Sequence, residues 1–181
     1  MARIKGTNVV RTVKWLRKNR DEARTLLSPR LHHYLDDRIL ISSWYPEEDH
    51  LELLRVAASL VAVPANIDRY AIIGRLAAHN DLAEVYKNIV QPGDHASWMN
   101  KAAALWRNYH DTGKMEATLL EPGLIMITLR DYEAASPEMC RIVGGYFEGV
   151  IEFAQGKVRK TTEVQCSLEG ASECAWRIEY R

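Results

Sequence analysis

The stretch that decides the fold is SPEMCRIVGGYFEGVIEFAQGKVRKTTEVQCSLEGASECAWRIEYR, residues 136–181. It contains the only three cysteines of the 181-residue chain, and with one glutamate they supply four candidate metal ligands: Cys140, Glu163, Cys166 and Cys174. Thiolate sulfur and carboxylate oxygen are both ordinary zinc donors, and a closed set of four protein ligands is typical of structural rather than catalytic zinc. The sequence therefore predicts a zinc ion that holds the fold together.

Cys140 is expected in the first turn of a helix. Ser136 and Pro137 fit the N-cap and the first helical position, and Glu138 places an acidic side chain in the first turn. Amide dipoles at a helix N-terminus favour a thiolate over a thiol. This position therefore suits a metal-binding cysteine.

The other ligands are expected on an antiparallel hairpin, because Cys166 and Cys174 flank a turn centred on Gly170. Glu163 is the weakest member, since residues three apart point to opposite faces of a regular strand. A bulge, a strand end, or a water molecule in place of Glu163 would resolve this conflict. Two alternatives stay open: three buried thiols that act as small hydrophobic side chains, or a Cys166–Cys174 disulfide, which would need an oxidising compartment.

The length indicates one domain over residues 1–181, with a helical part at 1–112 and a zinc-binding core at 113–181. No run approaches the roughly 18 apolar residues of a membrane span. The N-terminus also lacks the apolar segment of a signal peptide. We therefore expect a cytoplasmic protein.

The net charge of zero hides a basic start, because residues 1–30 carry nine Arg or Lys side chains against two acidic ones. A basic segment can bind nucleic acid or an anionic surface. However, Val9, Val13 and Leu16 recur at helical spacing, which favours an amphipathic helix with a solvated basic face. No direct contact with nucleic acid is expected.

The hydrophobic period changes along the chain, from helical spacing before Gly113 to strand alternation after it. The expected helices span residues 7–19, 22–27, a short segment after Pro29, the segment between Pro46 and Pro64, 67–90, 95–110 and 137–154. The expected strands span 115–120, 124–129, 161–168 and 174–180. Helices followed by a small antiparallel sheet indicate an α+β fold, in which an N-terminal helical layer packs on about four strands.

Three glycines lie inside the last predicted helix, at Gly144, Gly145 and Gly149. Each costs about 1 kcal/mol relative to alanine in a helix interior. Something is therefore expected to approach this backbone closely. It is either another helix, which we favour, or a ligand.

A small-molecule pocket is usually apolar, with a few placed polar groups. The second half of the chain offers a set of candidate pocket residues: Trp98, Trp106, Tyr109, His110, Gly145 and Tyr146. The same aromatic stripe is also what the core side of a helix looks like. No catalytic residue is expected, because no nucleophile stands out beside a base.

Three segments together resemble the 4-vinyl reductase domain family: residues 140–149, the pair Glu163 and Cys166, and Cys174 just before the aromatic Trp176. The resemblance is clearest over residues 115–181. The ligand order and spacing are also similar to the zinc site in the sensor domains of aromatic-responsive bacterial transcription activators, such as the phenol-sensing regulators. The resemblance implies that the four ligands named above bind structural zinc.

The wider superfamily of that resemblance includes heme nitric-oxide-binding domains and the small subunits of Golgi transport tethering complexes. It implies a non-enzymatic homodimer that binds or carries an apolar or aromatic molecule. The ATPase and DNA-binding domains of the activators are not found in this sequence, so a separate regulatory protein is the expected partner. Two alternatives remain, namely a tetrapyrrole-related 4-vinyl reductase-like enzyme or accessory protein, and a structural interaction protein like the tethering subunits.

Heme is the disfavoured cofactor. Superfamily kinship permits it, and an axial ligand would come from one of four histidines: His50, His79, His95 or His110. Each of these is more often a surface residue. The sequence also contains neither a phosphate-binding P-loop nor a dinucleotide-binding fingerprint.

Overall fold

The computed structural model describes residues 1–85 and 95–181, and only the backbone at residues 84, 85, 95, 96 and 98. The described part is an α+β protein with antiparallel sheets. Its backbone divides into two compact units. Unit 1 comprises Met1–Ile67 and Arg107–Thr112, and unit 2 comprises Asp68–Trp106 and Gly113–Arg181.

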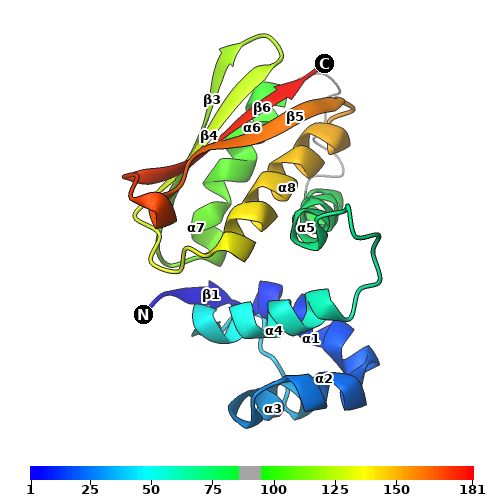
Figure 1. The fold of residues 1–181 in the computed structure, drawn as a ribbon. Coiled ribbons are helices and arrows are strands. Elements are labelled where there is room, and N and C mark those ends of the chain that lie inside the picture. Colours follow the sequence, from blue (N-terminus) through cyan, green and yellow to red (C-terminus); the bar gives the residue numbers. More distant parts are fainter. Residues whose placement is uncertain (86–94) are drawn as a thin grey trace. The chain divides into compact units, whose positions relative to one another are not determined.

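Unit 1 is mainly helical, as Figure 1 shows in blue and cyan. Its elements are β1 Arg3–Lys5, α1 Gly6–Lys18, α2 Arg20–Leu26, a 3-10 turn at Pro29–Leu31, α3 His32–Asp36, β2 Trp44–Pro46 and α4 Glu47–Ser59. The stripe Val9, Val13 and Leu16 of α1 is completely buried in the core of this unit, as its spacing predicts. The β1–β2 pair was not expected, because three-residue strands are too short to show an alternating pattern.

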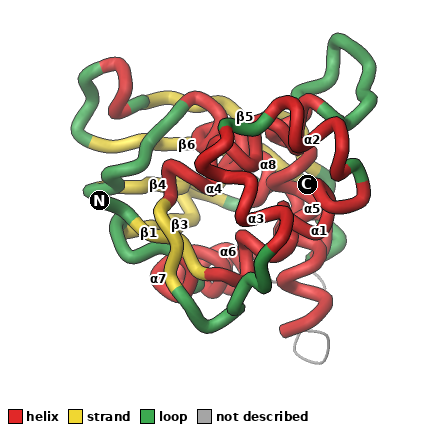
Figure 2. The backbone as a smooth tube through the Cα atoms, turned by 90° about the horizontal axis from the view of Figure 1, so that it is seen from below, coloured by secondary structure: helices red, strands yellow, loops and turns green. Residues whose placement is uncertain are grey.

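Unit 2 combines helices with a four-stranded antiparallel sheet of order β3-β4-β6-β5. Its elements are α5 Arg69–Val85, α6 His95–Ala104, β3 Lys114–Glu121, β4 Leu124–Arg130, α8 Pro137–Phe153, β5 Val158–Gln165, a 3-10 turn at Ser167–Glu169 and β6 Glu173–Tyr180. The short helix α7, Trp106–Tyr109, begins at the last residue of this part of unit 2 and continues into unit 1. The four strands run side by side, and helices α6 and α8 cover the sheet (Figures 1 and 2).

Strand alternation places the core of unit 2 between the sheet and α8. The buried side chains are Ile125, Ile127 and Leu129 of β4, Cys174, Trp176 and Ile178 of β6, and Val143, Phe147 and Val150 of α8. The predicted strands are therefore confirmed, with ends that differ by a few residues. The predicted helix 95–110 is divided at Leu105 into α6 and α7, and the end of the predicted helix 67–90 lies outside the described residues.

Helices α5 and α8 touch through their backbones. A Cβ atom added to Gly145 would lie 2.0 Å from the carbonyl oxygen of Ala71. From the other helix, a Cβ atom on Gly74 would lie 2.0 Å from the carbonyl oxygen of Ile142. Neither position can hold a larger residue without moving the helices apart, so glycine is needed here for close packing.

Gly144 points in a different direction from Gly145. A Cβ atom on Gly144 would lie 3.5 Å from Cδ1 of Trp176, which is an ordinary contact distance. Alanine is therefore expected to fit at Gly144 and to clash with α5 at Gly145. No helix in the described part of the chain is both long enough and apolar enough to cross a membrane.

Candidate metal centre

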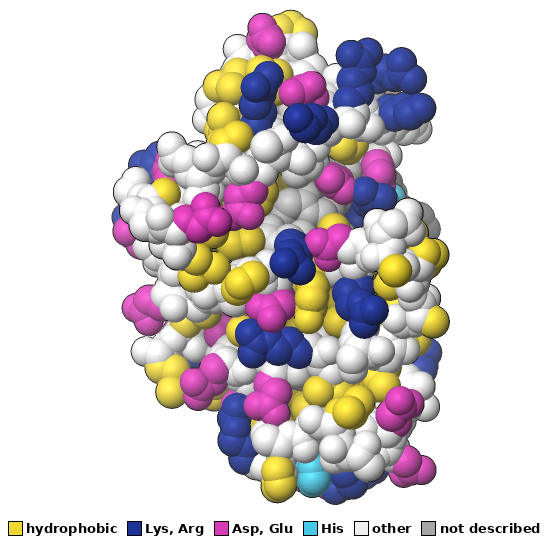
Figure 3. Space-filling model, in the orientation of Figure 1, with side chains coloured by type: hydrophobic (Ala, Val, Ile, Leu, Met, Phe, Trp, Pro, Cys, Tyr) yellow, Lys and Arg dark blue, Asp and Glu magenta, His cyan; other side chains and the backbone are white. Residues whose placement is uncertain are grey.

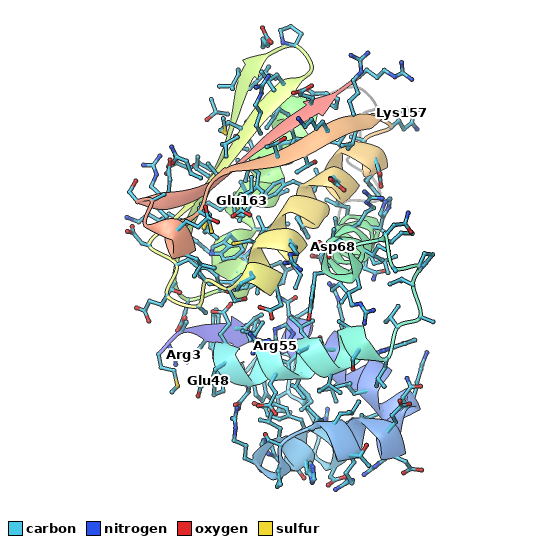
Figure 4. The ribbon with its side chains drawn as sticks, viewed as in Figure 1. Arg3, Glu48, Arg55, Asp68, Lys157 and Glu163 are labelled. Atoms are coloured by element: carbon cyan, nitrogen blue, oxygen red, sulfur yellow. The ribbon has the colours of Figure 1, made fainter. Side chains whose placement is uncertain are left out.

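The four predicted metal ligands come together in unit 2. The sulfur atoms of Cys140, Cys166 and Cys174 and a carboxylate oxygen of Glu163 all lie within 4.8 Å of one another. Cys140 belongs to α8, Glu163 to β5 and Cys174 to β6, and Cys166 follows β5 directly. Figure 4 labels Glu163 on β5, beside the part of the molecule where α8 begins. Side chains from three elements thus meet at one point.

The start of α8 positions the first cysteine. Ser136 has an extended backbone, and its hydroxyl accepts a hydrogen bond from the backbone N–H of Met139 at 3.1 Å. Pro137 is the first helical residue, and the N–H of Cys140 donates to the carbonyl oxygen of Ser136 at 3.0 Å. Cys140 therefore sits in the first turn, buried, with its sulfur at the positive end of the helix dipole.

A β-bulge brings Glu163 to the side of the cysteines. Glu163 pairs with Trp176 and Gln165 pairs with Ala175, so two steps along β5 match one step along β6. The extra residue, Val164, reverses the alternation of the strand. Residues 163 and 166 consequently share a face, which removes the conflict that a regular strand would create.

The turn between β5 and β6 holds the other two cysteines. Gly170 ends the 3-10 turn with φ of 92°, in the left-handed region that favours glycine, and the N–H of Ala171 donates to the carbonyl oxygen of Cys166 at 3.2 Å. The N–H of Ser167 lies 3.4 Å from the sulfur of Cys174, within hydrogen-bond distance. All three cysteines are free, so the structure contains no disulfide at this hairpin.

The electrostatics of the cluster disfavour negative charge unless a cation is present. Burial raises the pKa of the Cys140 thiol, and the nearby Cys174 and Glu163 raise it further. Burial also raises the pKa of Cys166, although the backbone N–H of Leu168 acts in the opposite direction. A metal ion would reverse this balance, because its positive charge favours thiolates.

An open cleft of about 420 Å³ lies beside the cluster. Its lining residues are Leu129, Asp131, Tyr132, Glu133, Ser167, Ser172, Glu173 and Cys174. The cleft is rich in carboxylates and differs from the apolar pocket expected for an aromatic ligand. Glu173 is already paired with Arg130, whose Nε lies 2.6 Å from its carboxylate oxygen.

The predicted pocket residues are distributed between the units. In unit 2, the buried ring of Trp106 lies edge-on to Tyr132 with centroids 5.0 Å apart, and the hydroxyl of Tyr146 donates to Asp81 at 3.3 Å. Gly145 packs against α5, as described above. Tyr109 and His110 belong to the segment Arg107–Thr112 of unit 1. The side chain of Trp98 lies outside the described residues.

A buried pair in unit 1 was not expected from the sequence. Nδ1 of His110 lies 2.5 Å from a carboxylate oxygen of Glu47, and both side chains are buried. From the sequence, Glu47 is expected only as a residue of the helix between Pro46 and Pro64. One local signal was available, because Glu47 and His50 are three residues apart and so lie on one face of α4.

No protein-family model matches this chain, and no curated protein sequence matches it. Solved structures do. An H-NOX protein from S. oneidensis in the Fe(II)NO ligation state has a TM-score of 0.66 at 14% identity, covering 98% of this chain and 99% of that one. An H-NOX structure from work on heme distortion has a TM-score of 0.70 at 15% identity, with coverages of 98% and 95%. An oxygen-binding H-NOX domain related to soluble guanylate cyclases has a TM-score of 0.65 at 14% identity, covering 98% of this chain and 95% of that one.

These matches show that the chain has the H-NOX fold, and they correct two predictions. Assignment to the 4-vinyl reductase domain family is wrong, although the heme nitric-oxide-binding proteins named as its wider kin partly fit. The residues behind that resemblance lie between 140 and 176, all in unit 2, whereas the similarity to H-NOX structures covers 98% of the chain. A short motif in unit 2 therefore does not identify the family of the whole chain.

The cofactor prediction, structural zinc with heme disfavoured, is overturned by the same neighbours. They are proteins described with heme and with Fe(II) ligation states. Neither the choice of zinc nor the preference against heme is retained.

A heme would need an axial ligand, and five of the six histidines have described side chains. Each already has a hydrogen-bond or ion-pair partner: His32 with Leu27, His33 with Arg30, His50 with Thr12, His79 with Glu152 and His110 with Glu47. The side chain of the sixth histidine, His95, lies outside the described residues. An axial ligand must point its nitrogen at the iron. A partner at one ring nitrogen leaves the other nitrogen available, as at Nδ1 of the buried His50, so these contacts neither assign nor exclude an axial ligand, and we assign no chemistry to heme in this chain.

Proposed function

We propose that this chain is a sensor domain that binds a small molecule and passes the bound state to another protein. One observation carries the proposal, namely the H-NOX fold over 98% of the chain, with TM-scores of 0.65 to 0.70 to the structures above. Those proteins are described with nitric oxide and oxygen as ligands. Because a fold alone does not fix a ligand, the ligand class needs a direct test.

The finer proposal is that the ligand is apolar or aromatic. The aromatic side chains of unit 2 support it, because Trp106 and Tyr132 stack edge to face and Tyr146 and Phe147 do the same at 5.6 Å. Aromatic side chains commonly line the pockets that bind apolar molecules. The carboxylate-rich cleft beside Cys174 is a poorer receptor for such a molecule.

The ligand test is a thermal-shift screen of the purified chain with hemin and with a panel of small aromatic compounds. A ligand at 100 times its Kd adds about 2.7 kcal/mol of stability. For a protein of this size that corresponds to a rise in Tm of roughly 5–10 °C. If neither hemin nor any aromatic compound raises the Tm, the sensor proposal is wrong.

The second part of the proposal concerns the metal centre. Cys140, Glu163, Cys166 and Cys174 bind one metal ion that ties the first turn of α8 to the β5–β6 hairpin. The distances within 4.8 Å and the burial of two of the sulfurs support this. Three sulfur donors and one oxygen donor favour a thiolate-preferring transition-metal ion. Four protein ligands leave no open position for a substrate.

Titration with Co²⁺ tests the metal centre. Thiolate-bound Co²⁺ should give sulfur-to-metal charge-transfer absorption and the visible bands of a tetrahedral ion, with one equivalent bound per chain. Replacement of an outer contact of a metal site weakens affinity by about 10- to 100-fold, so loss of a ligand in Glu163→Gln should cost at least about tenfold. Glu169→Gln is the matched control, because Glu169 lies on the same hairpin but outside the cluster. Equal affinity in both variants would remove Glu163 from the ligand set.

We also propose that the domain is a cytoplasmic homodimer with a separate regulatory protein as its partner, and that it does not bind nucleic acid directly. Basic and acidic side chains are interspersed over most of the face in Figure 3, which supports the last point. Light scattering on the purified chain should give twice the mass of 20.7 kDa. A monomer at all concentrations would exclude the dimer.

A further inference from the structure

Unit 1 contains a buried polar cluster that takes no part in the proposed metal centre. Its members are Thr12 of α1, Glu47 and His50 of α4, and His110 of the segment Arg107–Thr112. All four are buried, with relative exposures of 8%, 2%, 5% and 8%. Charged and titratable side chains are rarely buried to this extent unless they are paired.

Two short contacts form two pairs within the cluster, and His110 acts electrostatically on His50. Nδ1 of His110 and a carboxylate oxygen of Glu47 are 2.5 Å apart, and Nε2 of His50 and the hydroxyl of Thr12 are 3.1 Å apart. Nδ1 of His50 is buried and has no hydrogen-bond partner among the described residues. His110 thus has an anionic neighbour, whereas His50 has a neutral one.

The same short segment is fastened to β1 one residue further on. The backbone N–H of Asp111 donates to the carbonyl oxygen of Arg3 at 3.1 Å. The backbone N–H and Nε of Arg3 donate to the two carboxylate oxygens of Asp111 at 2.6 and 2.7 Å. Ile4 and His110 also form an isolated antiparallel bridge. Figure 4 labels Arg3 on β1.

This segment links elements of unit 2. Along the chain it follows α6 and precedes β3, both of which belong to unit 2, yet its own contacts are with unit 1. Its attachment therefore determines whether residues 107–112 are ordered within unit 1. Both attachments lie within the described residues of unit 1.

Burial disfavours a proton on His50. Burial is the larger cause and the electrostatic effect of His110 is the smaller one; together they lower the pKa of His50 to about 3. Other charged groups of unit 1 are already paired: Glu47 is bonded to His110, Asp111 to Arg3, and Asp49 on the same helix to Arg30 and Tyr34. From α1 the contact is the uncharged hydroxyl of Thr12.

We propose that Glu47, His50 and His110 form an acid-sensitive latch, which holds residues 107–112 in unit 1 and opens when His50 takes up a proton. An opened latch exposes the imidazole to water, where its pKa returns to about 6.5. The closed form binds fewer protons than the open form between these two pKa values. The closed form is therefore fully stable above about pH 6.5 and loses stability as the pH falls through 6.5 toward 3.

The size of the pH effect on opening follows from the uptake of one proton by His50. With pKa values of about 3 when closed and about 6.5 when open, the opening constant rises about 30-fold between pH 7.5 and pH 5.0. This change lies within the range that amide hydrogen exchange detects. The latch is independent of the proposed sensor function, so either proposal can fail alone.

Hydrogen exchange on the full chain at pH 5.0 and 7.5, corrected for the intrinsic pH dependence of exchange, tests the latch. In the wild type, the amide of Asp111 and peptides covering residues 107–112 should open about 30-fold more often at pH 5.0. In His50→Gln, whose amide still reaches Thr12 but does not titrate, the rise should vanish. His79→Gln is the control, because His79 is a half-buried histidine of unit 2 and lies outside the cluster, and this variant should behave as the wild type. An equal rise in His50→Gln, or no rise in the wild type, would overturn the proposal.

A second measurement avoids dependence on the folding of the variant. An NMR titration of the wild-type imidazole signals should show His50 still neutral at pH 5.0 in molecules whose Asp111 amide is protected. A His50 ring that gains its proton near pH 6.5 while Asp111 stays protected would contradict the latch.

Discussion

Two polar clusters, one in each unit, bring together segments that are distant in the sequence, but the kinds of ionisable group in them differ. The cluster of unit 2 gathers three thiols and one carboxylate, which are all acidic groups. The cluster of unit 1 pairs an imidazole with a carboxylate and adds a second imidazole beside a hydroxyl. A group of acids needs an external cation to become ionised, whereas a mixed group can balance its own charge.

This difference shows what each cluster is expected to respond to. The thiol cluster should respond to metal supply, because burial raises the pKa values of the Cys140 and Cys166 thiols and a cation would favour their thiolates. The imidazole cluster should respond to protons, because one histidine is buried without a partner for its second nitrogen. The same structural role, holding a segment in place, is thus sensitive to two different chemical signals.

Removal of a metal ligand should have the largest effect on stability. Cys140→Ser replaces a buried sulfur in the first turn of α8, and loss of a structural metal typically costs about 4 kcal/mol or more. Chemical denaturation of the metal-loaded protein measures it. Addition of a chelator to the wild type should produce a loss of similar size, and should produce none in the variant. If a chelator leaves the stability of the wild type unchanged, the thiol cluster does not depend on a metal ion and the proposed difference between the two clusters is wrong.

Gly145→Ala should have the second largest effect and should lower the free energy of unfolding by about 3 kcal/mol. The new methyl group would lie 2.0 Å from the carbonyl oxygen of Ala71, so α5 and α8 must separate. Gly144→Ala is the matched control, since its methyl group would be 3.5 Å from Trp176 and alanine favours the helix by about 1 kcal/mol. Denaturation midpoints should therefore move in opposite directions. Equal destabilisation by both would mean that the two helices are not in backbone contact.

Glu47→Gln should destabilise unit 1 by about 2 kcal/mol, because a buried hydrogen bond to a charged partner is replaced by a neutral one. Co²⁺ binding in unit 2 should be unchanged. Glu48→Gln is the control, because Glu48 is the exposed next residue on α4 and is labelled in Figure 4. Chemical denaturation measures the loss of stability, and a separate Co²⁺ titration followed by visible absorption measures metal binding. A change in metal affinity on Glu47→Gln would show that the clusters are not independent.

Ser136→Ala should have the smallest effect, about 1 kcal/mol, through loss of the N-cap hydrogen bond to Met139. It should also weaken metal binding slightly, because the same turn positions Cys140. Ser172→Ala, at an exposed position in the hairpin, should leave thermal stability unchanged. If the two variants melt at the same temperature, the N-cap hydrogen bond of Ser136 does not contribute to the stability of the protein.

Local patterns were sufficient for most elements of the fold. The spacing of Val9, Val13 and Leu16 predicted α1, and the sequence Ser136-Pro137 predicted the start of α8. Strand alternation predicted the four strands of unit 2, because each has one face on the core. The four metal residues came together as their chemistry suggested, and their role as metal ligands stays a prediction.

Features that depend on tertiary contacts could not be predicted. The bulge at Val164 is a matter of register between β5 and β6, and strand periodicity carries no sign of it. Glu47 and His110 are 63 positions apart, so no local pattern connects them. The assignment to one family failed for a related reason, since a motif in residues 140–176 says little about residues 1–110. The expectation of a single domain, beside the two compact units, also stays a prediction.

The central claim is that three thiols and a carboxylate form one metal centre in unit 2. The most direct measurement is the metal content of the purified chain together with its absorption after exchange into Co²⁺. We expect one metal ion per chain and a sulfur-to-cobalt charge-transfer band that disappears in Cys166→Ser. A chain that purifies without metal and gives no such band at saturating Co²⁺ would contradict the claim.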